Sequence, residues 1–292
     1  MKGPAPRALF LGARRSFEES RAVLFGCPFD ETASRRKGAR SGPGALRAAS
    51  DAIETYSPLL DADLEDLPFC DVGDLALPEG DVAGALERIG AEARRILSAG
   101  KIPFGLGGDH LVSLPLIEAA AEAHPGLLVL QWDAHADLRD AYEGAALSHA
   151  TVMRRAGERV GPGRVLPFGV RSGTREEWTR LRGEARLRGE DGPRPLTPAA
   201  VEEALGESAG APLYLTLDLD VLDPGEFPGT GTPEPGGVSF AALSACIAAL
   251  GRAGAPIVAL DAVELSPPCD PGGVSAVAAA KAVRELLLVL PA

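Results

Sequence analysis

The chain is poor in cysteine and lacks long hydrophobic runs, and each shortage excludes a class of protein. Its 4 cysteines, Cys27, Cys70, Cys246 and Cys269, fit neither a zinc ribbon nor a CxxC pair. We expect free thiols in a reducing, cytoplasmic setting. No segment approaches the roughly 20 apolar residues that span a membrane. Residues 1–15 are basic and lack a signal-peptide apolar stretch. We therefore expect no membrane partner.

Basic residues are also scarce. Lysine and arginine total 29 against 41 aspartates and glutamates, a net charge of −12. Nucleic acid is a poor partner for such a surface, because its phosphate backbone selects basic patches. Small cationic molecules suit this charge better. An acidic surface that serves only to keep the protein soluble would explain the same net charge. The charge alone therefore does not distinguish a cationic ligand from a solubility effect.

The residues that are abundant indicate a sizeable folded core. Apolar residues make up 46% of the chain, while 35 glycines and 25 prolines are dispersed and form no low-complexity tract. At 292 residues the length allows one large α/β domain or two small ones. No linker divides the sequence, and we expect a single domain over residues 1–292.

Apolar runs alternate with helical patterns along the chain. The expected strands are 21–29, 102–108, 126–133, 164–170, 212–220 and 256–263. The expected helices are 43–57, 81–99, 113–123, 197–209, 239–250 and 275–290, with 182–197 as a loop. Asp81, Thr197 and Ser239 are suitable N-caps. Continuous apolar strands are typical of a parallel sheet buried on both faces, which predicts an α/β fold with helices on both sides of the sheet.

Metal-ligand residue types follow several of these strands directly. His110 ends a GGDH motif, Asp133, His135 and Asp137 form DAHAD, and Asp218 and Asp220 form DLD. Glu264 follows the strand expected at 256–263. Ligands bind outside the carboxyl ends of parallel strands, so we expect these groups to meet at one edge of the sheet.

The three motifs together favour a pair of divalent cations. In an extended segment, side chains at i, i+2 and i+4 share one face. Four aspartates would balance two divalent cations, and a water between the cations would be strongly acidified. Oxygen-rich ligands with only two imidazoles favour Mn(II) over zinc. Each motif alone is often a turn or a helix cap; their combination predicts a metal site.

The motifs resemble the ureohydrolase family of arginases and agmatinases, and the similarity runs from GARSGPGALRAAS at 38–50 to VELSPPCD at 263–270. It includes DLDVLDPGEFPGTGTPEPGG at 218–237. The resemblance implies a three-layer α/β/α, arginase/deacetylase-like fold with a mostly parallel central sheet. It also implies two Mn(II) ions per subunit and a homo-oligomer, a trimer or hexamer.

The same resemblance implies roles for single residues. One ion would be held by His110, Asp133, Asp137 and Asp218, and the other by His135, Asp133, Asp218 and Asp220. Glu264, His149 and Asp137 would be catalytic, Glu264 by pairing with the substrate guanidinium and His149 by moving protons. Thr232, in the loop 230–233, and His149 would also contact substrate. Asp109 would orient a ligand or cap a turn. By itself, Glu264 could equally form a salt bridge, and His149 could start a helix.

The implied reaction is hydrolysis of a guanidino C–N bond with release of urea. Residues 137–149 resemble bacterial agmatinases, which form putrescine in polyamine biosynthesis, and Glu143 suits a dicationic substrate. Arg139 stands where arginases have asparagine. It could bind the carboxylate of guanidinobutyrate or pair with Asp140 or Glu143, and we favour the pairing. Guanidinobutyrase, aminopropylagmatine ureohydrolase and arginase remain alternatives, and a non-catalytic metal-binding module is a remote one.

Overall fold

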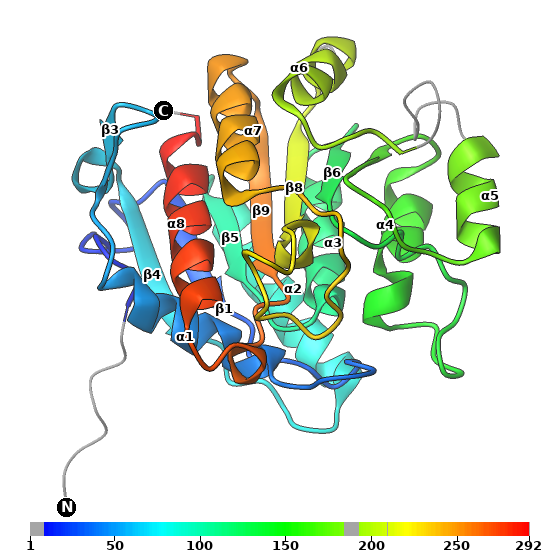
Figure 1. Cartoon of the computed structure of the whole chain (residues 1–292). Helices are drawn as coiled ribbons and strands as arrows, with labels where there is room; N and C mark the ends of the chain where they lie inside the picture. The colour runs from blue at the N-terminus through cyan, green and yellow to red at the C-terminus, as the bar shows by residue number, and fades with distance from the viewer. Residues whose placement is uncertain (1–8, 184–192, 209, 292) are drawn as a thin grey trace, which may run out of the picture.

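The computed structural model describes residues 9–183, 193–208 and 210–291, built around a seven-stranded sheet (Figure 1). The strand order is β4-β1-β5-β9-β8-β6-β7, and every pairing between these strands is parallel. The strands are β1 (Ala22–Gly26), β4 (Phe69–Asp74), β5 (Ile102–Leu106), β6 (Leu128–Trp132), β7 (Val165–Phe168), β8 (Leu213–Asp218) and β9 (Ile257–Val263).

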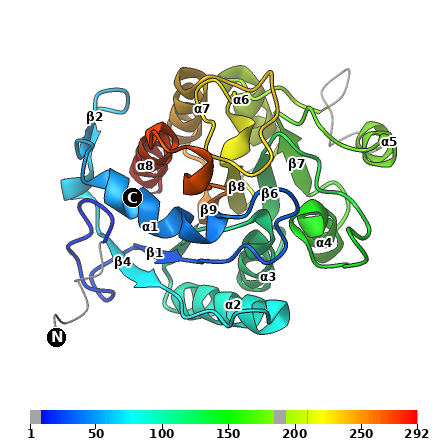
Figure 2. The ribbon, with the colours of Figure 1, turned by 60° about the horizontal axis from the view of Figure 1, so that its bottom comes forward.

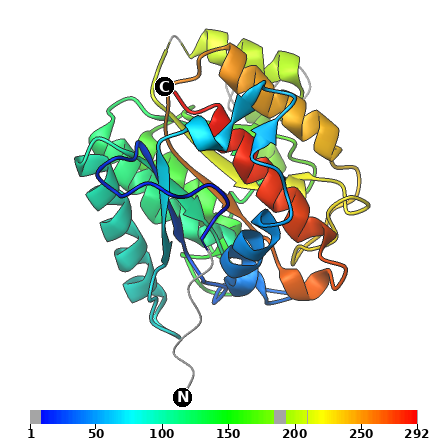
Figure 3. The same ribbon diagram turned by 90° about the vertical axis from the view of Figure 1, so that its left-hand side faces the viewer.

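Helices cover both faces of this sheet. One layer holds α1 (Gly42–Ser50), α6 (Pro198–Glu207), α7 (Phe240–Arg252) and α8 (Val274–Leu288); the other holds α2 (Val82–Ser98), α3 (Ser113–Ala123) and α4 (Val152–Val160). Figure 2 shows the sheet between the two layers, with α5 (Arg175–Gly183) beyond the β7 edge. Figure 3 shows the red α8 and orange α7 on one side and the teal helices on the other. The expected three-layer α/β/α fold is confirmed.

Successive side chains along each strand point to opposite faces of the sheet, so each strand contributes to two hydrophobic cores. In β1, Leu24 belongs to the core under α7 and α8, while Val23 and Phe25 belong to the core under α2 and α3. All three side chains are fully buried. Burying a side chain of this size contributes about 2 kcal/mol, so the sheet is held from both faces.

The expected helix starts are confirmed by hydrogen bonds. The side chains of Asp81, Thr197 and Ser239 each accept a backbone N–H from the first turn of the helix that follows. These bonds satisfy donors that have no partner within the helix.

Several boundaries and elements differ from the sequence expectation. The helix expected over 43–57 ends at Ser50, and residues 56–57 form β2 (Tyr56–Ser57), paired antiparallel with β3 (Ala62–Asp63). The strand β4 and the helices α4 and α5 were not expected. Most of the loop expected at 182–197 falls outside the described residues. The cysteines are free, as expected. No helix among the described residues is long and apolar enough to cross a membrane.

Short 3-10 helices follow several strands and carry residues of interest. They are η1 (Ala39–Ser41), η2 (Leu64–Asp66), η3 (His110–Val112), η4 (His149–Thr151), η6 (Leu219–Val221) and η7 (Pro267–Cys269). Three of them, η3, η4 and η6, begin at or beside an expected site residue.

Candidate metal centre and active site

The strand order explains why the predicted groups meet. The four neighbouring strands β5, β9, β8 and β6 form the middle of the sheet. His110 follows β5, Glu264 follows β9, Asp218 ends β8 and Asp133 follows β6. Parallel strands present their carboxyl ends at one edge, so these side chains converge there.

Three carboxylates surround His110. Its Nδ1 lies 3.2 Å from Asp133 Oδ2, 3.0 Å from Asp137 Oδ2 and 3.2 Å from Asp218 Oδ2. This nitrogen is buried, and among the described residues no group meets it with hydrogen-bond geometry. Burial, then Asp220 and Asp133, raise the pKa of Asp218 well above its usual value. A buried, orphaned imidazole nitrogen amid carboxylate oxygens is a donor set that fits a divalent cation.

The far side of the His110 ring is fixed by a buried relay. Its Nε2 lies 3.0 Å from Thr216 Oγ1, and Thr216 donates to Asp261 Oδ1 at 2.7 Å. Tyr214 donates to the other oxygen of Asp261. Because the only hydroxyl proton of Thr216 goes to Asp261, Thr216 accepts from Nε2. This arrangement leaves the lone pair of Nδ1 available to a cation.

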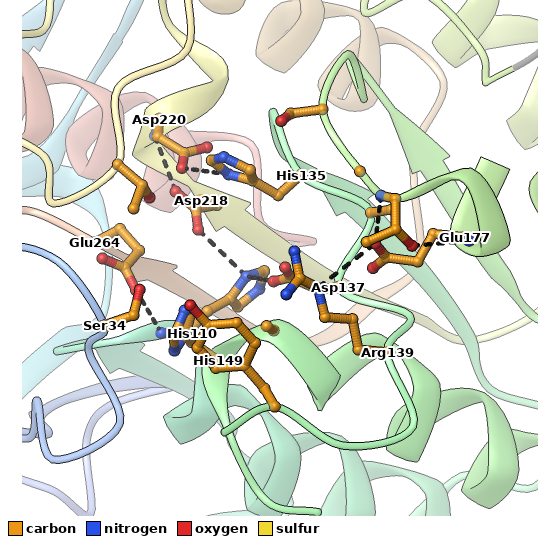
Figure 4. Close-up of a pocket in the computed structure, with 17 residues that line it drawn as sticks. Ser34, His110, His135, Asp137, Arg139, His149, Glu177, Asp218, Asp220 and Glu264 are labelled. Atoms are coloured by element: carbon orange, nitrogen blue, oxygen red, sulfur yellow. Dashed lines mark hydrogen bonds and ion pairs between the residues drawn. The ribbon is translucent and has the colours of Figure 1, made fainter. Parts of the chain in front are cut away.

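A second group gathers around the other imidazole. His135 Nδ1 lies 2.8 Å from Asp220 Oδ2 and 3.8 Å from Asp133 Oδ1. Burial opposes protonation of His135, but the neighbouring carboxylates raise its pKa to about 11. Asp133 thus belongs to both groups, which is the position that a bridging ligand requires. Figure 4 shows His110 and His135 with Asp218 and Asp220. Asp218 contacts His110, and its sharing with the second group stays a prediction.

Gln131, which the sequence interpretation missed, fixes Asp133 and the backbone of His135 relative to each other. Its amide donates to Asp133 Oδ2 at 2.8 Å and to the carbonyl of His135 at 2.9 Å. It lies in β6 and is buried among apolar neighbours. A buried glutamine in an otherwise apolar strand run was the available signal.

Two site residues adopt left-handed backbone conformations. Asp137 has φ +53° and Glu264 has φ +66°. The pattern of a single extended segment therefore does not hold at Asp137, whose backbone is left-handed and whose carboxylate lies 3.0 Å from His110 Nδ1. Such conformations cost about 1–2 kcal/mol for residues with a Cβ, so the surrounding contacts must enforce them.

Glu264 lies at the metal end of the cavity and is held by backbone. Its Oε1 accepts the N–H of His110 at 2.9 Å. Burial, followed by Asp109 and Asp220, raises the pKa of Glu264 well above its usual value. Among the described residues it forms no ion pair with lysine or arginine. A cation entering the cavity would therefore stabilise the charged form of this carboxyl group.

His149 lines the same cavity. Its Nδ1 lies 3.2 Å from Ser148 Oγ, and its ring meets the Tyr142 ring edge-on with centroids 5.4 Å apart. Burial, together with the nearby His110, His135 and Arg139, lowers the pKa of His149 to about 4. The imidazole is therefore neutral at neutral pH, whereas its unperturbed value would place it near working pH.

Asp109 caps a turn, one of its two expected roles. Its Oδ1 accepts the N–H of Leu111 at the start of η3. Its Oδ2 accepts from both the backbone N–H and the hydroxyl of Thr32. Burial raises the pKa of Asp109 to about 7.

Both imidazoles, His149, Glu264 and three of the four aspartates line a cavity of about 290 Å³. Its lining consists of Ser34, His110, His135, Ala136, Asp137, Arg139, Tyr142, His149, Ala150, Ser172, Gly173, Thr174, Glu177, Asp218, Asp220, Thr232 and Glu264. Figure 4 shows Glu264 and Ser34 at one end and Arg139 with Glu177 at the other. Thr232 lies where expected. Glu143 does not line the cavity: it is exposed, with φ +49°, in the turn between Tyr142 and Ala145.

Arg139 pairs with a different acid from those expected. Its Nε lies 3.7 Å from Glu177 Oε2, and its guanidinium carbon lies 4.8 Å from the centre of the Tyr142 ring. Asp140 instead contacts Arg154 and Arg155. Pairing with Asp140 or Glu143 was therefore the wrong expectation. Glu177 was missed because it follows β7, far from the recognised motifs.

Comparison with known proteins agrees with this geometry. The family model described as the arginase family matches residues 20–289. An agmatinase of Bacillus cereus is 43% identical over 282 residues, covering 96% of this chain and 95% of the relative. A guanidinobutyrase of Pseudomonas aeruginosa is 36% identical, covering 92% and 86%. A crystal structure described as a candidate agmatinase from Clostridium difficile has a TM-score of 0.90 and 41% identity, covering 94% and 98%. The chain therefore belongs to the arginase family, as an agmatinase-like ureohydrolase.

Proposed function

We propose that this chain hydrolyses agmatine to putrescine and urea with the help of two Mn(II) ions. The observation that carries the proposal is the cluster of four buried aspartates, two imidazoles and Glu264, all of which except Asp133 line one cavity. Among the described residues, no lysine or arginine pairs with those acids. Similarity to agmatinases supports agmatine as the substrate.

The donor set indicates which residues would hold the ions. His110, Asp133, Asp137 and Asp218 would hold one, and His135, Asp133, Asp218 and Asp220 the other. Four carboxylates balance the charge of two divalent cations, and carboxylate oxygen with imidazole nitrogen suits Mn(II). When bound, such a pair acidifies a water molecule, so that hydroxide is present near neutral pH.

Glu264 would hold the guanidinium at the metal end of the cavity. A guanidinium is a planar fork that donates two parallel hydrogen bonds to a carboxylate. The oxygen Oε1 is already fixed by the N–H of His110, which sets the direction of the carboxylate. Thr232 lines the same region. This anchoring places the guanidinium carbon beside the aspartate cluster.

His149 would move the proton that the leaving amine requires. Its ring lines the cavity and is neutral, with Nδ1 beside Ser148. Nε2 would take over the proton that the attacking water releases and pass it to the departing nitrogen as the C–N bond breaks; the low pKa favours giving the proton up. Asp137, which lines the cavity 3.0 Å from His110 Nδ1, would accept a proton from the attacking water.

Guanidinobutyrate hydrolysis is the second candidate, because Arg139 lines the cavity and could bind a carboxylate. We favour agmatine because Glu177 and Tyr142 already face that guanidinium. Hydrolysis of arginine or aminopropylagmatine, or a non-catalytic metal-binding role, ranks lower. A single domain over 1–292, a cytoplasmic location and a trimeric or hexameric assembly stay predictions.

A urea-release assay with added Mn(II) tests the proposal. It compares agmatine with guanidinobutyrate, guanidinopropionate, arginine and aminopropylagmatine at equal concentration. We expect agmatine to give the highest kcat/KM. A higher kcat/KM for guanidinobutyrate would make that guanidino acid the preferred substrate in place of agmatine. If none of the five compounds releases urea, the ureohydrolase assignment for this site is rejected.

Glu264→Gln provides the internal control. The amide has the same shape without the charge, so the protein should keep its manganese while kcat/KM falls about a hundredfold. Unchanged kinetics would mean that Glu264 does not pair with the substrate.

A further inference from the structure

Thr32 connects two parts of the active site that lie far apart in sequence. It belongs to the segment after β1 and does not line the cavity. Its hydroxyl lies 2.9 Å from Asp109 Oδ2 and 3.0 Å from the backbone nitrogen of His149. The sequence separations are 77 and 117 residues, so no local pattern indicates either contact.

The direction of these hydrogen bonds is fixed by the available protons. A backbone N–H can only donate, so the hydroxyl oxygen of Thr32 accepts from His149. The single hydroxyl proton is then directed at the Asp109 carboxylate, which also accepts the backbone N–H of Thr32 at 3.0 Å. The result is a continuous chain from the turn that precedes His110 to the backbone of His149.

His149 needs such a partner because of its place in η4. It is the first residue of that helix, and the first N–H groups of a helix have no partner within it. The N-cap Ser148 accepts the N–H of Ala150, and Thr151 closes a capping box with Ser148. Neither bond involves the N–H of His149, which Thr32 alone accepts among the described residues.

The same segment also holds the opposite wall of the cavity. Arg36 donates from Nη2 to the carbonyl of Thr230 at 2.8 Å and from Nε to the carbonyl of Gly231 at 3.1 Å. Ser34, between Thr32 and Arg36, lines the cavity itself, at the Glu264 end (Figure 4). The loop after β1 therefore contacts three separate site segments.

We propose that Thr32 is a positioning residue for the reaction: its hydroxyl sets the place of the His149 imidazole relative to the aspartate cluster. The inference rests on the proposed function, in which His149 carries the proton to the leaving amine. It goes beyond that function by assigning a role to a residue that touches neither substrate nor metal ligands.

Thr32→Val tests this because valine keeps the shape and removes only the hydroxyl. We expect kcat for agmatine to fall about ten- to a hundredfold, since small displacements of catalytic groups have effects of this size. KM should stay within about twofold and bound manganese should be unchanged. Thr32→Ser should restore kcat. The control Thr179→Val removes an exposed threonine hydroxyl that bonds to Arg175 in α5, and should behave like the wild type.

A spectroscopic readout separates positioning from general damage. The chain has 4 histidines, so the imidazole Cε1–H signals of chelator-treated protein can be assigned one by one, that of His149 by its loss in His149→Asn. Thr32→Val should move the His149 signal and leave that of His124 in place; Thr32→Ser should return it. An unmoved His149 signal, or failure of Thr32→Ser to restore kcat, would overturn the proposal. These spectra contain no substrate, so an enzyme inactive on agmatine would contradict the proposed function, while the His149 signal would still show whether Thr32 sets the place of the imidazole.

Discussion

Two buried groups of acids lie in this molecule, and they are neutralised in different ways. In the first, Arg47 of α1 forms a two-pronged ion pair with Asp71 of β4, with contacts of 2.7 and 2.9 Å, and also contacts Asp74. In the second, Asp133, Asp137, Asp218 and Asp220 contact imidazoles, and none pairs with lysine or arginine among the described residues.

The difference separates a structural device from a binding site. Burying an unpaired charge costs several kcal/mol, so a carboxylate inside a protein needs a partner. Arg47 is that partner for Asp71, and the pair ties α1 to the edge of the sheet. The four aspartates of the second group have only the imidazoles of His110 and His135 as cationic partners among the described residues, whereas two divalent cations would balance all four charges. A fold that tolerates this repulsion is suited to hold cations.

The largest effect is expected from removing the carboxylate shared by both halves of the metal site. Asp133→Asn should lose bound manganese and lower kcat/KM by about a thousandfold or more, because Asp133 faces both imidazoles. Asp218→Asn should behave similarly. Metal analysis after desalting and urea release measure both. Asp51→Asn, at an exposed position, is the control; two tightly held ions with full activity in Asp133→Asn would refute bridging.

Breaking the Arg47–Asp71 ion pair should lower the stability of the protein without changing its metal binding. Arg47→Ala leaves the buried Asp71 without its cation, and should lower the free energy of unfolding by about 3–5 kcal/mol. Denaturant titration measures the change. Replacing both partners, as Arg47→Met with Asp71→Asn, should recover most of it. Loss of manganese from the folded Arg47→Ala protein would contradict the separation of the two groups.

Replacing one aspartate by asparagine should change the folding stability of the metal-free protein in opposite directions in the two groups. Burial and Asp133 raise the pKa of Asp137 from 3.8 to about 6, so its charged form opposes folding. Stability of chelator-treated wild type should therefore fall as pH rises from about 4 to 6. Asp137→Asn should remove that loss and gain about 1–3 kcal/mol at pH 7, whereas Asp71→Asn should destabilise. Thermal unfolding at pH 4 and pH 7 measures both; a destabilised Asp137→Asn at pH 7 would contradict the assignment.

The smallest effect is expected at the far end of the cavity. Arg139 is half-buried and its ion pair with Glu177 is long, so Arg139→Ala should change kcat/KM for agmatine by no more than about twofold. The same assay with guanidinobutyrate is the comparison. Selective loss of guanidinobutyrate hydrolysis, from a substantial wild-type rate, would give Arg139 a role in substrate choice.

Sequence patterns predicted the elements that are apolar on both faces. The strands β5, β6, β8 and β9 were located because they are continuous hydrophobic runs, and their polar successors identified the site. The edge strand β4 was missed because polar residues interrupt Phe69–Asp74 and Val72 is exposed. Helix 43–57 was drawn too long because the chain turns at Asp51 without a glycine or proline to mark the end.

The supporting residues of the site were beyond sequence reasoning for a different reason. Thr32 and Glu177 act through hydrogen bonds to backbone or to other side chains, and such contacts carry no residue pattern. Gln131 differs from them, because a glutamine in an apolar strand is a visible signal. Glu177, for example, accepts the N–H of Leu138, 39 residues away. Only the packing of separate loops at one sheet edge brings these groups together, and that packing is a property of the whole fold.

The place of β9 has a consequence for how this enzyme is made. It is the last of the seven strands in sequence, yet it lies at the centre of the sheet, between β5 and β8. A nascent chain that has not yet reached Ile257 therefore consists of two half-sheets, each with an open edge of unpaired backbone. Joining them completes the core and delivers Glu264 in the same event. Premature termination before this point leaves an aggregation-prone product, not a weaker enzyme.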